Sequence, residues 1–286
     1  SLTAKYKISQ LTIMGRLLYS LYLNGAKQGV VAKNASKFSP SVSLSWQPMR
    51  SQLFFVRSSY KNIFRMPTFN EAYFDHYGSA DVLPESTDQF NVGATYTAKS
   101  AGVLTQATFA VDGYLNNIKD MIVAVPYNMF IWSMVNLGKV RTVGVDATAE
   151  VTITPKRSHD LTLMGSYSFQ RAMPRTNPDA LDWMKQVAYI PKHSGSASIS
   201  YENPWVNVSV SGTGVSERYT TNENIPATKI DGYIELGASV WRDFAIKGHT
   251  LGARFDVLNL LNTNYCVVAR YPMPGRQFRL TLSFTY

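Results

Sequence analysis

Aromatic side chains gather in two polar stretches of this chain, and their chemistry suits contact with a flat ligand. The candidates for such contact are Tyr73, Phe74, His76, Tyr77, Met129, Phe130 and Trp132. Aromatic rings offer broad, rigid contact area and defined stacking geometry. The same side chains also suit the boundary between a membrane and water, where aromatic belts form. Ligand contact and membrane-interface packing are therefore both open interpretations of these seven residues.

The elements that must position these residues show alternation of apolar and polar side chains. In the terminal stretch the apolar parity consists of Phe278, Leu280, Leu282, Phe284 and Tyr286. Successive residues of a strand point to opposite faces, so this stretch has one apolar and one wet face. The same alternation recurs at 143–153 and 195–211. It predicts about twelve strands along the chain, of which about ten alternate clearly.

The connections between these strands alternate in length. Short connections are expected near 47–50, 98–102, 154–158, 203–204 and 242–248. Long connections are expected near 23–38, 62–86, 125–136, 172–187, 217–228 and 262–274. A membrane barrel of the up-and-down type has short periplasmic turns and longer outer loops. The sequence thus predicts an all-β fold, an antiparallel up-and-down transmembrane β-barrel in a bacterial outer membrane, with the long loops outside.

Composition agrees with this architecture. Charged residues make up 16% of the 286 residues, and aromatic residues make up 13%. The mean hydropathy of −0.12 does not oppose a membrane barrel, because alternating strands average to neutral. The formal charge of +9 comes without a basic run or a nucleic-acid motif, so no nucleic acid is predicted as a partner. We assign the charge to the lumen and loops, or to contact with anionic lipid headgroups.

Two other functions would suit a complete barrel of twelve strands. An autotransporter translocator begins with a helix inside the lumen, and residues 1–10 are too short for one. An outer-membrane phospholipase needs a serine and a histidine at its outer rim, oriented by a third polar group. His76 alone falls in a long loop, and no serine is suitably spaced from it. We predict no enzyme activity, no cofactor and no metal; Asp75 and Asp81 are too few ligands for calcium.

Several motifs resemble those of TonB-dependent outer-membrane receptors. The stretch from Ser59 to Glu71 resembles the family pattern Phe-Arg-x-Pro-x-x-x-Glu, matched here by Phe64, Arg65, Pro67 and Glu71. Leu83-Pro84-Glu85-Ser86 is similar to the Leu-x-Pro-Glu segment that follows. Asn117-Ile118-Lys119-Asp120-Met121-Ile122 is similar to a strand end of the family. Val257-Leu258-Asn259-Leu260-Leu261-Asn262, Tyr265 and Pro274-Gly275-Arg276 resemble its C-terminal signature.

The resemblance covers residues 50–286, and it implies a barrel of about 22 strands closed by a plug domain. Residues 1–286 are then expected to be one β-barrel region, the C-terminal part of a longer receptor, with the plug and early strands absent. The implied function is active uptake of a scarce large nutrient, such as a ferric siderophore, haem or cobalamin. The siderophore and cobalamin branch fits the 64–86 segment best.

The implied partners are a metal-chelate or cobalamin ligand, TonB through the absent plug, outer-membrane lipid and lipopolysaccharide, and the barrel-assembly machinery. We expect that machinery to recognise the terminal apolar parity as a C-terminal barrel signal. Phe64, Arg65, Pro67 and Glu71 are expected to fix the base of an outer loop, with direct ligand contact as the alternative. The wet parity carries charges expected to be paired or solvated in the lumen, namely Asp112, Asp146, Glu150, Arg254, Asp256 and Arg279.

Overall fold

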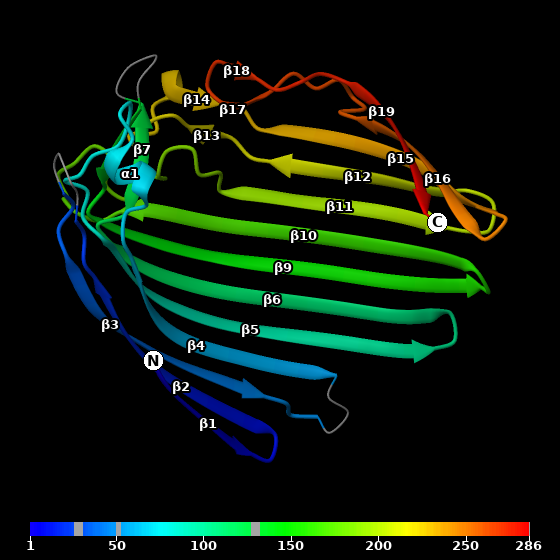
Figure 1. The fold of residues 1–286 in the computed structure, drawn as a ribbon, viewed down its shortest axis with the longest axis horizontal. Helices are drawn as coiled ribbons and strands as arrows, with labels where there is room; N and C mark the ends of the chain where they lie inside the picture. The colour runs from blue at the N-terminus through cyan, green and yellow to red at the C-terminus, as the bar shows by residue number, and fades with distance from the viewer. Residues whose placement is uncertain (26–30, 50–52, 127–131, 286) are drawn as a thin grey trace. The chain divides into compact units, whose positions relative to one another are not determined.

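The computed structural model describes residues 1–25, 31–49, 53–126 and 132–285, and its main feature is one antiparallel sheet of 13 strands. The strands are β1 (Leu2–Ile8), β2 (Leu11–Tyr22), β3 (Ala35–Trp46), β4 (Phe54–Arg65), β5 (Glu85–Ala101), β6 (Leu104–Lys119), β9 (Lys139–Lys156), β10 (His159–Pro174), β11 (His193–Glu202), β12 (Asn207–Val215), β15 (Tyr233–Ile246), β16 (His249–Leu258) and β19 (Gln277–Thr285). Each strand pairs with the next one along the chain, apart from short hairpins within the connections (Figure 1). The up-and-down order is thus confirmed.

The sheet has one strand more than the sequence pattern predicted. The predicted strand at 8–22 is β2, and β1 precedes it as the first arm of a tight hairpin. Ser9 allows this turn by adopting a φ of 51°, in the left-handed region. The register of this hairpin runs from Leu2 opposite Leu17 to Ile8 opposite Leu11.

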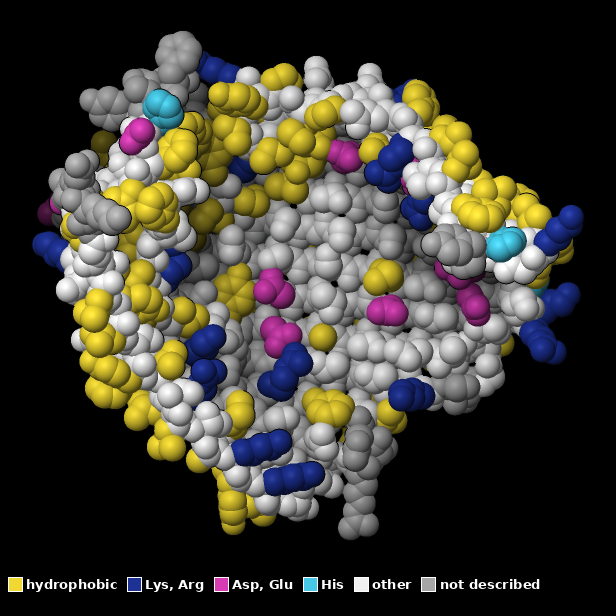
Figure 2. Space-filling model, in the orientation of Figure 1, with side chains coloured by type: hydrophobic (Ala, Val, Ile, Leu, Met, Phe, Trp, Pro, Cys, Tyr) yellow, Lys and Arg dark blue, Asp and Glu magenta, His cyan; other side chains and the backbone are white. Residues whose placement is uncertain are grey.

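Alternation places apolar side chains on the exposed face of the strands. In β3, Phe38 is 60% exposed and Trp46 is 49% exposed, whereas Ser39, on the opposite face of the strand, is buried. The register of β3 against β2 is unbroken, so Ser39, Ser41 and Ser43 share the opposite face. An exposed apolar face with a covered polar one is the arrangement expected of strands in contact with lipid. Figure 2 shows a face on which the charged side chains, dark blue for Lys and Arg and magenta for Asp and Glu, are separated by white side chains and backbone.

Two compact units make up the chain, and the first comprises Ser1–Ala94, Asp112–Gly144 and Arg171–Val187. It contains strands β1 to β4 and two small elements of the long connections. These are the helix α1 (Phe69–Tyr73) and the hairpin of β7 (Ile122–Pro126) and β8 (Trp132–Asn136).

The second unit comprises Thr95–Val111, Val145–Gln170 and Ala188–Tyr286. Its long connections contain two short hairpins, β13 (Arg218–Tyr219) with β14 (Lys229–Ile230), and β17 (Cys266–Val268) with β18 (Tyr271–Pro272). A single turn of 3-10 helix spans Pro226–Thr228. Over the described ranges of both units, no helix has the length and apolar composition needed to cross a membrane.

Candidate functional site

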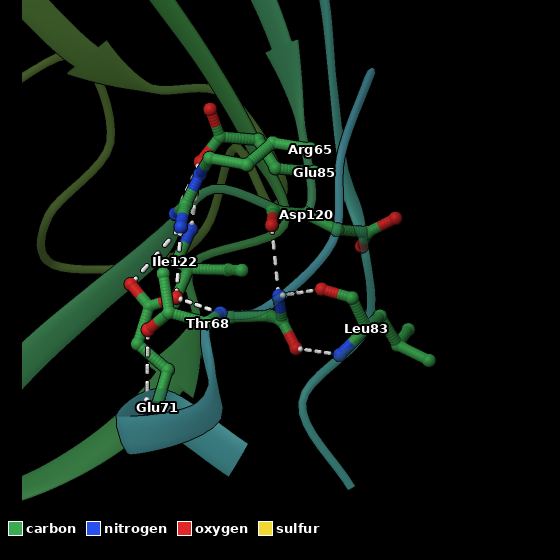
Figure 3. Close-up of polar contacts among 8 residues, drawn as sticks. Arg65, Thr68, Glu71, Leu83, Glu85, Asp120 and Ile122 are labelled. Atoms are coloured by element: carbon green, nitrogen blue, oxygen red, sulfur yellow. Dashed lines mark hydrogen bonds and ion pairs between the residues drawn. The ribbon is translucent and has the colours of Figure 1, made fainter. Parts of the chain in front are cut away.

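The first long connection after β4 is anchored by Arg65, the last residue of that strand. Its Nη1 donates to both oxygens of Glu71, at 3.0 and 2.8 Å, and its Nη2 lies 3.5 Å from Glu85 Oε2. Glu85 Oε2 also accepts the backbone N–H of Ile122 at 3.1 Å. Figure 3 shows these groups converging from β4, α1, β5 and β7. We call Arg65, Glu71, Glu85 and Ile122 the Arg65 cluster.

Helix α1 brings Glu71 into this cluster through its capping residues. Thr68 is the N-cap, and its Oγ1 accepts the Glu71 N–H at 3.3 Å while Glu71 Oε2 accepts the Thr68 N–H at 2.7 Å. This reciprocal capping box satisfies two backbone donors that a helix start leaves free. Pro67 in front of the cap disfavours helical backbone at Met66, so the strand ends before the helix begins.

Ionisation of Glu71 is favoured in this setting. Partial burial of its carboxyl opposes the charged form, but hydrogen bonds from the Thr68 backbone, the Arg65 guanidinium and the Thr68 hydroxyl outweigh it, and they lower the pKa of Glu71 below 4.5. Its side chain is 18% exposed and that of Glu85 is 19% exposed, whereas the Arg65 side chain is 37% exposed. The cluster is thus a partly desolvated ion network with both carboxylates supplied with donors.

Asn136, at the end of β8, joins the same connection to the β7–β8 hairpin. Its Oδ1 accepts the Leu83 N–H at 2.8 Å, and its Nδ2 donates to Leu83 O at 3.1 Å and Asp120 O at 2.8 Å. A second link runs from the Met134 N–H to Tyr77 O at 3.0 Å. The 66–84 connection and the 120–138 connection therefore form one hydrogen-bonded body.

The aromatic candidates divide between this body and positions beyond the described chain. Phe74 stacks on Tyr77 with ring centroids 4.6 Å apart, and His76 packs edge-on against Phe74 at 5.7 Å. Trp132 begins β8 and is half-buried. Met129 and Phe130 lie outside the described residues. The structure thus brings Phe74, His76 and Tyr77 together on the connection that the Arg65 cluster holds.

Tyr73 has a structural contact in addition to its position beside these rings. Its hydroxyl oxygen accepts the Ala32 N–H at 2.8 Å, which joins the 23–34 connection to α1. Its ring also lies 5.3 Å from that of Phe69. Phe64, from the family motif, packs against Tyr22 with centroids 6.0 Å apart. The sequence did not indicate any of these three contacts.

A tight turn after α1 positions Phe74, His76 and Tyr77, which we call the aromatic cluster. The Gly78 N–H donates to Phe74 O at 2.7 Å, and a Cβ at Gly78 would lie 2.5 Å from Phe74 N. Only glycine therefore permits this approach of the backbone to itself. The Ser79 N–H then donates to Glu71 O at 2.8 Å, which returns the chain to the Arg65 cluster.

The second unit fixes its long connections around a different arginine. Arg218 is 3% exposed, and its Nη2 donates to Cys266 O at 2.6 Å and Val267 O at 2.9 Å. Its guanidinium lies 5.9 Å from the ring centre of Tyr233, which stacks on Tyr265 at 3.9 Å. The Tyr265 hydroxyl donates to Glu235, and this bond to a carboxylate raises the pKa of Tyr265 to about 12.

Two asparagines of the C-terminal signature hold the connection between β16 and β19 in place through hydrogen bonds. Asn259 is 2% exposed; its Nδ2 donates to Thr263 O at 2.9 Å and Pro274 O at 3.2 Å, and its Oδ1 accepts the Thr263 N–H at 2.8 Å. Asn262 Oδ1 accepts the Arg276 N–H at 2.9 Å. Both asparagines adopt positive φ, 48° and 55°, which asparagine tolerates better than most residues. These contacts set where β19 starts.

Among the charges of the wet parity, Asp256 occupies the most covered position, with 1% exposure. Its Oδ1 accepts from the Ser239 hydroxyl at 2.6 Å and from Arg254 Nε at 2.7 Å, and its Oδ2 accepts from Arg279 Nε at 3.1 Å. The carboxylate therefore joins β15, β16 and β19. In the first unit Arg57 Nη2 donates to both oxygens of Asp112 at 3.0 Å.

The terminal apolar parity is exposed, as are the other residues of β19. Phe278, Leu280 and Leu282 are each 67% exposed and Phe284 is 61% exposed. Tyr286 lies outside the described residues. Four large apolar side chains on one face of β19 form a lipid-compatible surface.

Comparison with solved structures shows the same fold in other proteins. Three solved structures share the fold: the FrpB iron transporter from Neisseria meningitidis (18% identity, TM-score 0.67), the ferric citrate transporter FecA in its unliganded form (18%, 0.73), and BauA, the ferric preacinetobactin receptor from Acinetobacter baumannii (15%, 0.68). The alignments cover 98%, 99% and 96% of this chain but 44%, 44% and 40% of those chains. The chain thus spans about two fifths of their length.

A family model described as "TonB dependent receptor-like, beta-barrel" matches residues 6–260. Members of this family are transporters of the outer membrane and not enzymes, which excludes the phospholipase interpretation. This match and the order of the strands lead to one conclusion: the chain belongs to the TonB-dependent receptor family, as part of its β-barrel.

Proposed function

We propose that residues 1–286 form one β-barrel region of a receptor that takes up a scarce, large metal chelate across the outer membrane with energy delivered by TonB. A ferric siderophore is the first candidate, because FrpB, FecA and BauA are named as iron or ferric-chelate transporters. Haem and cobalamin are the other candidates from the resemblance. The fold likeness supports the transport class, and the choice among these ligands rests on the loops.

The observation that carries this proposal is the aromatic cluster on a fixed base. Phe74, His76 and Tyr77 lie on a connection that the Arg65 cluster and Asn136 tie to two neighbouring segments. A fixed base lowers the entropy lost when a ligand is bound, and aromatic faces supply the contact area. Tyr73, Trp132, Met129 and Phe130 complete the proposed contact set, of which Met129 and Phe130 lie outside the described residues.

The remaining partners follow from the same proposal. TonB would act through a plug domain in the full-length receptor. The exposed apolar face of the strands would contact outer-membrane lipid and lipopolysaccharide, and the barrel-assembly machinery would recognise the apolar parity of β19. Phe64, Arg65, Pro67 and Glu71 would serve as loop-base residues, because Arg65 and Glu71 use their charges on each other.

The test uses the full-length receptor in cells that lack their own copy. Binding and TonB-dependent uptake of labelled ferric siderophores, haem and cobalamin are measured for the wild type and for the variant Phe74→Ala, Tyr77→Ala, Trp132→Ala. We expect the variant to bind the transported ligand about tenfold or more weakly, because three aromatic contacts are lost. Tyr73 is kept, so that its bond to Ala32 still holds the neighbouring connection.

Leu181→Ala is the matched control, since Leu181 is 79% exposed on another long connection of the same unit. It should leave affinity and receptor quantity unchanged. Wild-type affinity in a correctly assembled triple variant would show that the three rings are interface residues. Absence of TonB-dependent uptake of every chelate would contradict the proposed transport function itself.

A further inference from the structure

An arginine stands on the apolar, lipid-compatible surface of the second unit. Arg242 of β15 lies in register with Ala253 of β16 and, through it, with Leu282 of β19, which is 67% exposed. Its neighbours of the same parity, Val240 and Phe244, are each 43% exposed. In the described strands β10, β11, β12, β15, β16 and β19 of this unit, no other Lys, Arg, Asp or Glu belongs to this face.

The acidic residues at the same end of these strands point to the opposite face. Asp160 and Glu202 are in register with each other, and Asp243 follows Arg242 directly. Because successive residues of a strand face opposite ways, these three carboxylates belong to the polar face that carries Asp256. Among the described residues, no ion pair involves Arg242. The charge of this arginine is thus uncompensated on the lipid side.

The Arg242 side chain bends toward the short connection between β11 and β12. Its Nη1 donates to Trp205 O, and its guanidinium carbon lies 5.3 Å from the ring centre of Phe244. Asn203 fixes this connection, because its Oδ1 accepts the Trp205 N–H at 2.9 Å and the Val206 N–H at 3.2 Å. A long cationic side chain that bends in this way keeps its stem on apolar surface and brings its charge to the membrane interface.

An aromatic group adjoins the guanidinium on the same face. Trp205 is 65% exposed, and its ring packs edge-on against that of His159 with centroids 5.5 Å apart. His159 Nδ1 lies 2.7 Å from the Tyr201 hydroxyl oxygen, so a hydrogen bond joins β10 to β11. Among the described residues, no acceptor pairs with the Trp205 indole N–H. Tryptophan and tyrosine gather at the level of lipid headgroups, where one end of the ring is apolar and the other polar. We define the Arg242 surface as Arg242, Trp205, Phe244, His159 and Tyr201.

Further cations lie in the short connections at this end of the second unit. Figure 1 shows the β9–β10, β11–β12 and β15–β16 connections at one end of the strands. They contain Lys156, Arg157 and Lys247, which are exposed and, within the described residues, form no ion pair. Short connections of a membrane barrel face the periplasm. The Arg242 surface therefore lies at the headgroups of the periplasmic leaflet, with positive charge around it.

We propose that the Arg242 surface binds the phosphate of an anionic phospholipid in the periplasmic leaflet, so that the receptor holds a lipid such as phosphatidylglycerol in preference to a zwitterionic one. A guanidinium presents its N–H donors in a planar fork that suits phosphate oxygens. The Trp205 indole N–H supplies a further donor. The exposed apolar residues of β15 and β19 contact the acyl chains. Such a site is independent of the chelate that the receptor transports.

The distribution of charge favours an anionic headgroup over phosphatidylethanolamine. Basic residues beside a membrane attract anionic lipids. The ammonium group of an ethanolamine headgroup would meet Lys156, Arg157 and Lys247, and it would find no carboxylate on the lipid-facing parity of the neighbouring described strands. The net charge of the lipid is therefore the property that this surface distinguishes.

The experiment measures lipid contact at this surface in the full-length receptor. The receptor is placed in phosphatidylcholine nanodiscs that contain a trace of photoactivatable phosphatidylglycerol, and cross-links to residues 203–207 are quantified by mass spectrometry. The test variant is Arg242→Gln, which keeps a polar side chain without the charge. Lys99→Gln is the matched control, because Lys99 is an exposed cation near the short connection between β5 and β6. Electrophoresis of unheated samples verifies that each variant has assembled.

We expect Arg242→Gln to lower these cross-links about tenfold, which is the effect of losing one charge-assisted hydrogen bond. Arg242→Lys should recover part of the loss, because an ammonium keeps the charge but lacks the planar fork. Lys99→Gln should match the wild type. In the wild type, unlabelled phosphatidylglycerol should compete strongly and phosphatidylethanolamine weakly. Inorganic phosphate should not compete, since it has no acyl chains to contact the apolar face.

Four outcomes would overturn the inference. Wild-type cross-linking in the assembled Arg242→Gln variant would show that the arginine only fixes the Trp205 connection. An equal loss in Lys99→Gln would indicate general attraction by surface charge. Equal competition by the two unlabelled lipids would contradict selection by headgroup charge, and displacement by inorganic phosphate would indicate a site for free anions. None of these outcomes bears on the proposed transport function, because chelate uptake is not the quantity measured.

Discussion

At the scale of single residues, Arg65 connects local and distant parts of the chain. Its partner Glu71 lies six residues away, at a spacing that the capping box of α1 fixes. Its other partner, Glu85, lies 20 residues away at the start of β5. One guanidinium serves both carboxylates because it has several donors in a planar fork, which lysine lacks. Each carboxylate also receives a backbone N–H, so neither charge is left unpaired.

Acid is expected to release this connection. The pKa of Glu71 is lowered in the folded state, so its ionisation contributes stability that is present above 4.5 and lost as pH falls through the folded value. Hydrogen–deuterium exchange across 66–84 in the full-length receptor should therefore rise as the pH is lowered from 5 towards 3, by roughly tenfold relative to the strands once the intrinsic pH dependence is removed.

Glu71→Gln separates this effect from general acid damage. The amide keeps one oxygen acceptor but loses the charge, so exchange at 66–84 should already be raised at pH 7 and should change little on acidification. Asp81→Asn, an exposed residue of the same connection, should behave as the wild type. A wild-type pH profile in Glu71→Gln would show that another carboxylate controls the connection.

From the sequence, only contacts between residues close together along the chain could be predicted. The family motif singled out Arg65 and Glu71, whereas the capping box Thr68-x-x-Glu71, although its pattern can be read in the sequence, was recognised only in the structure. Asn136 meets Leu83 across 53 positions, and Arg218 meets Val267 across 49. No spacing rule links such residues, because folding of two separate loops decides their contact. Whether the seven aromatic candidates bind ligand stays a prediction.

At the scale of elements, alternation was a sufficient guide to the sheet and a poor one to its connections. Every predicted strand is present, because contact with lipid on one face imposes period two on the sequence. The miss at β1 has a local cause: Ser9 and Gln10 form a two-residue turn without glycine, asparagine or proline. The hairpins inside long connections were missed too, since β7–β8 depends on tertiary contacts such as Asn136.

Arginine substitutions can test which face of β12 contacts lipid. Val210 is 51% exposed near the middle of the strand, and Ser209 lies on the opposite face. Val210→Arg should lower the free energy of unfolding in a lipid bilayer by about 2–4 kcal/mol, because the charge finds no water there. Ser209→Arg, next to it, should cost less than about 1 kcal/mol. Equal losses, measured by urea titration in vesicles, would reverse the assignment of faces.

At the scale of the whole molecule, apolar alternation is a property of single strands, whereas the grouping of charges depends on how several strands align. Apolar parity is set strand by strand, and the sequence shows it directly. Lys5, Arg16 and Lys61 share one face only once four strands align, since they are separated in sequence by up to 56 positions. The sequence therefore shows no basic run. Register, which alternation leaves undetermined, is the missing information.

The same scale governs what residues 1–286 are able to do by themselves. In the 13-stranded order β1 and β19 stand at the two ends, each hydrogen-bonded to one neighbour. Unpaired strand edges are costly in a membrane, where no water satisfies their N–H and C=O groups. We expect residues 1–286, expressed alone in cells lacking the receptor, to give no TonB-dependent uptake of labelled siderophore or cobalamin, whereas the full-length receptor restores it. TonB-dependent uptake by residues 1–286 alone would show that these strands close by themselves and that transport needs no plug.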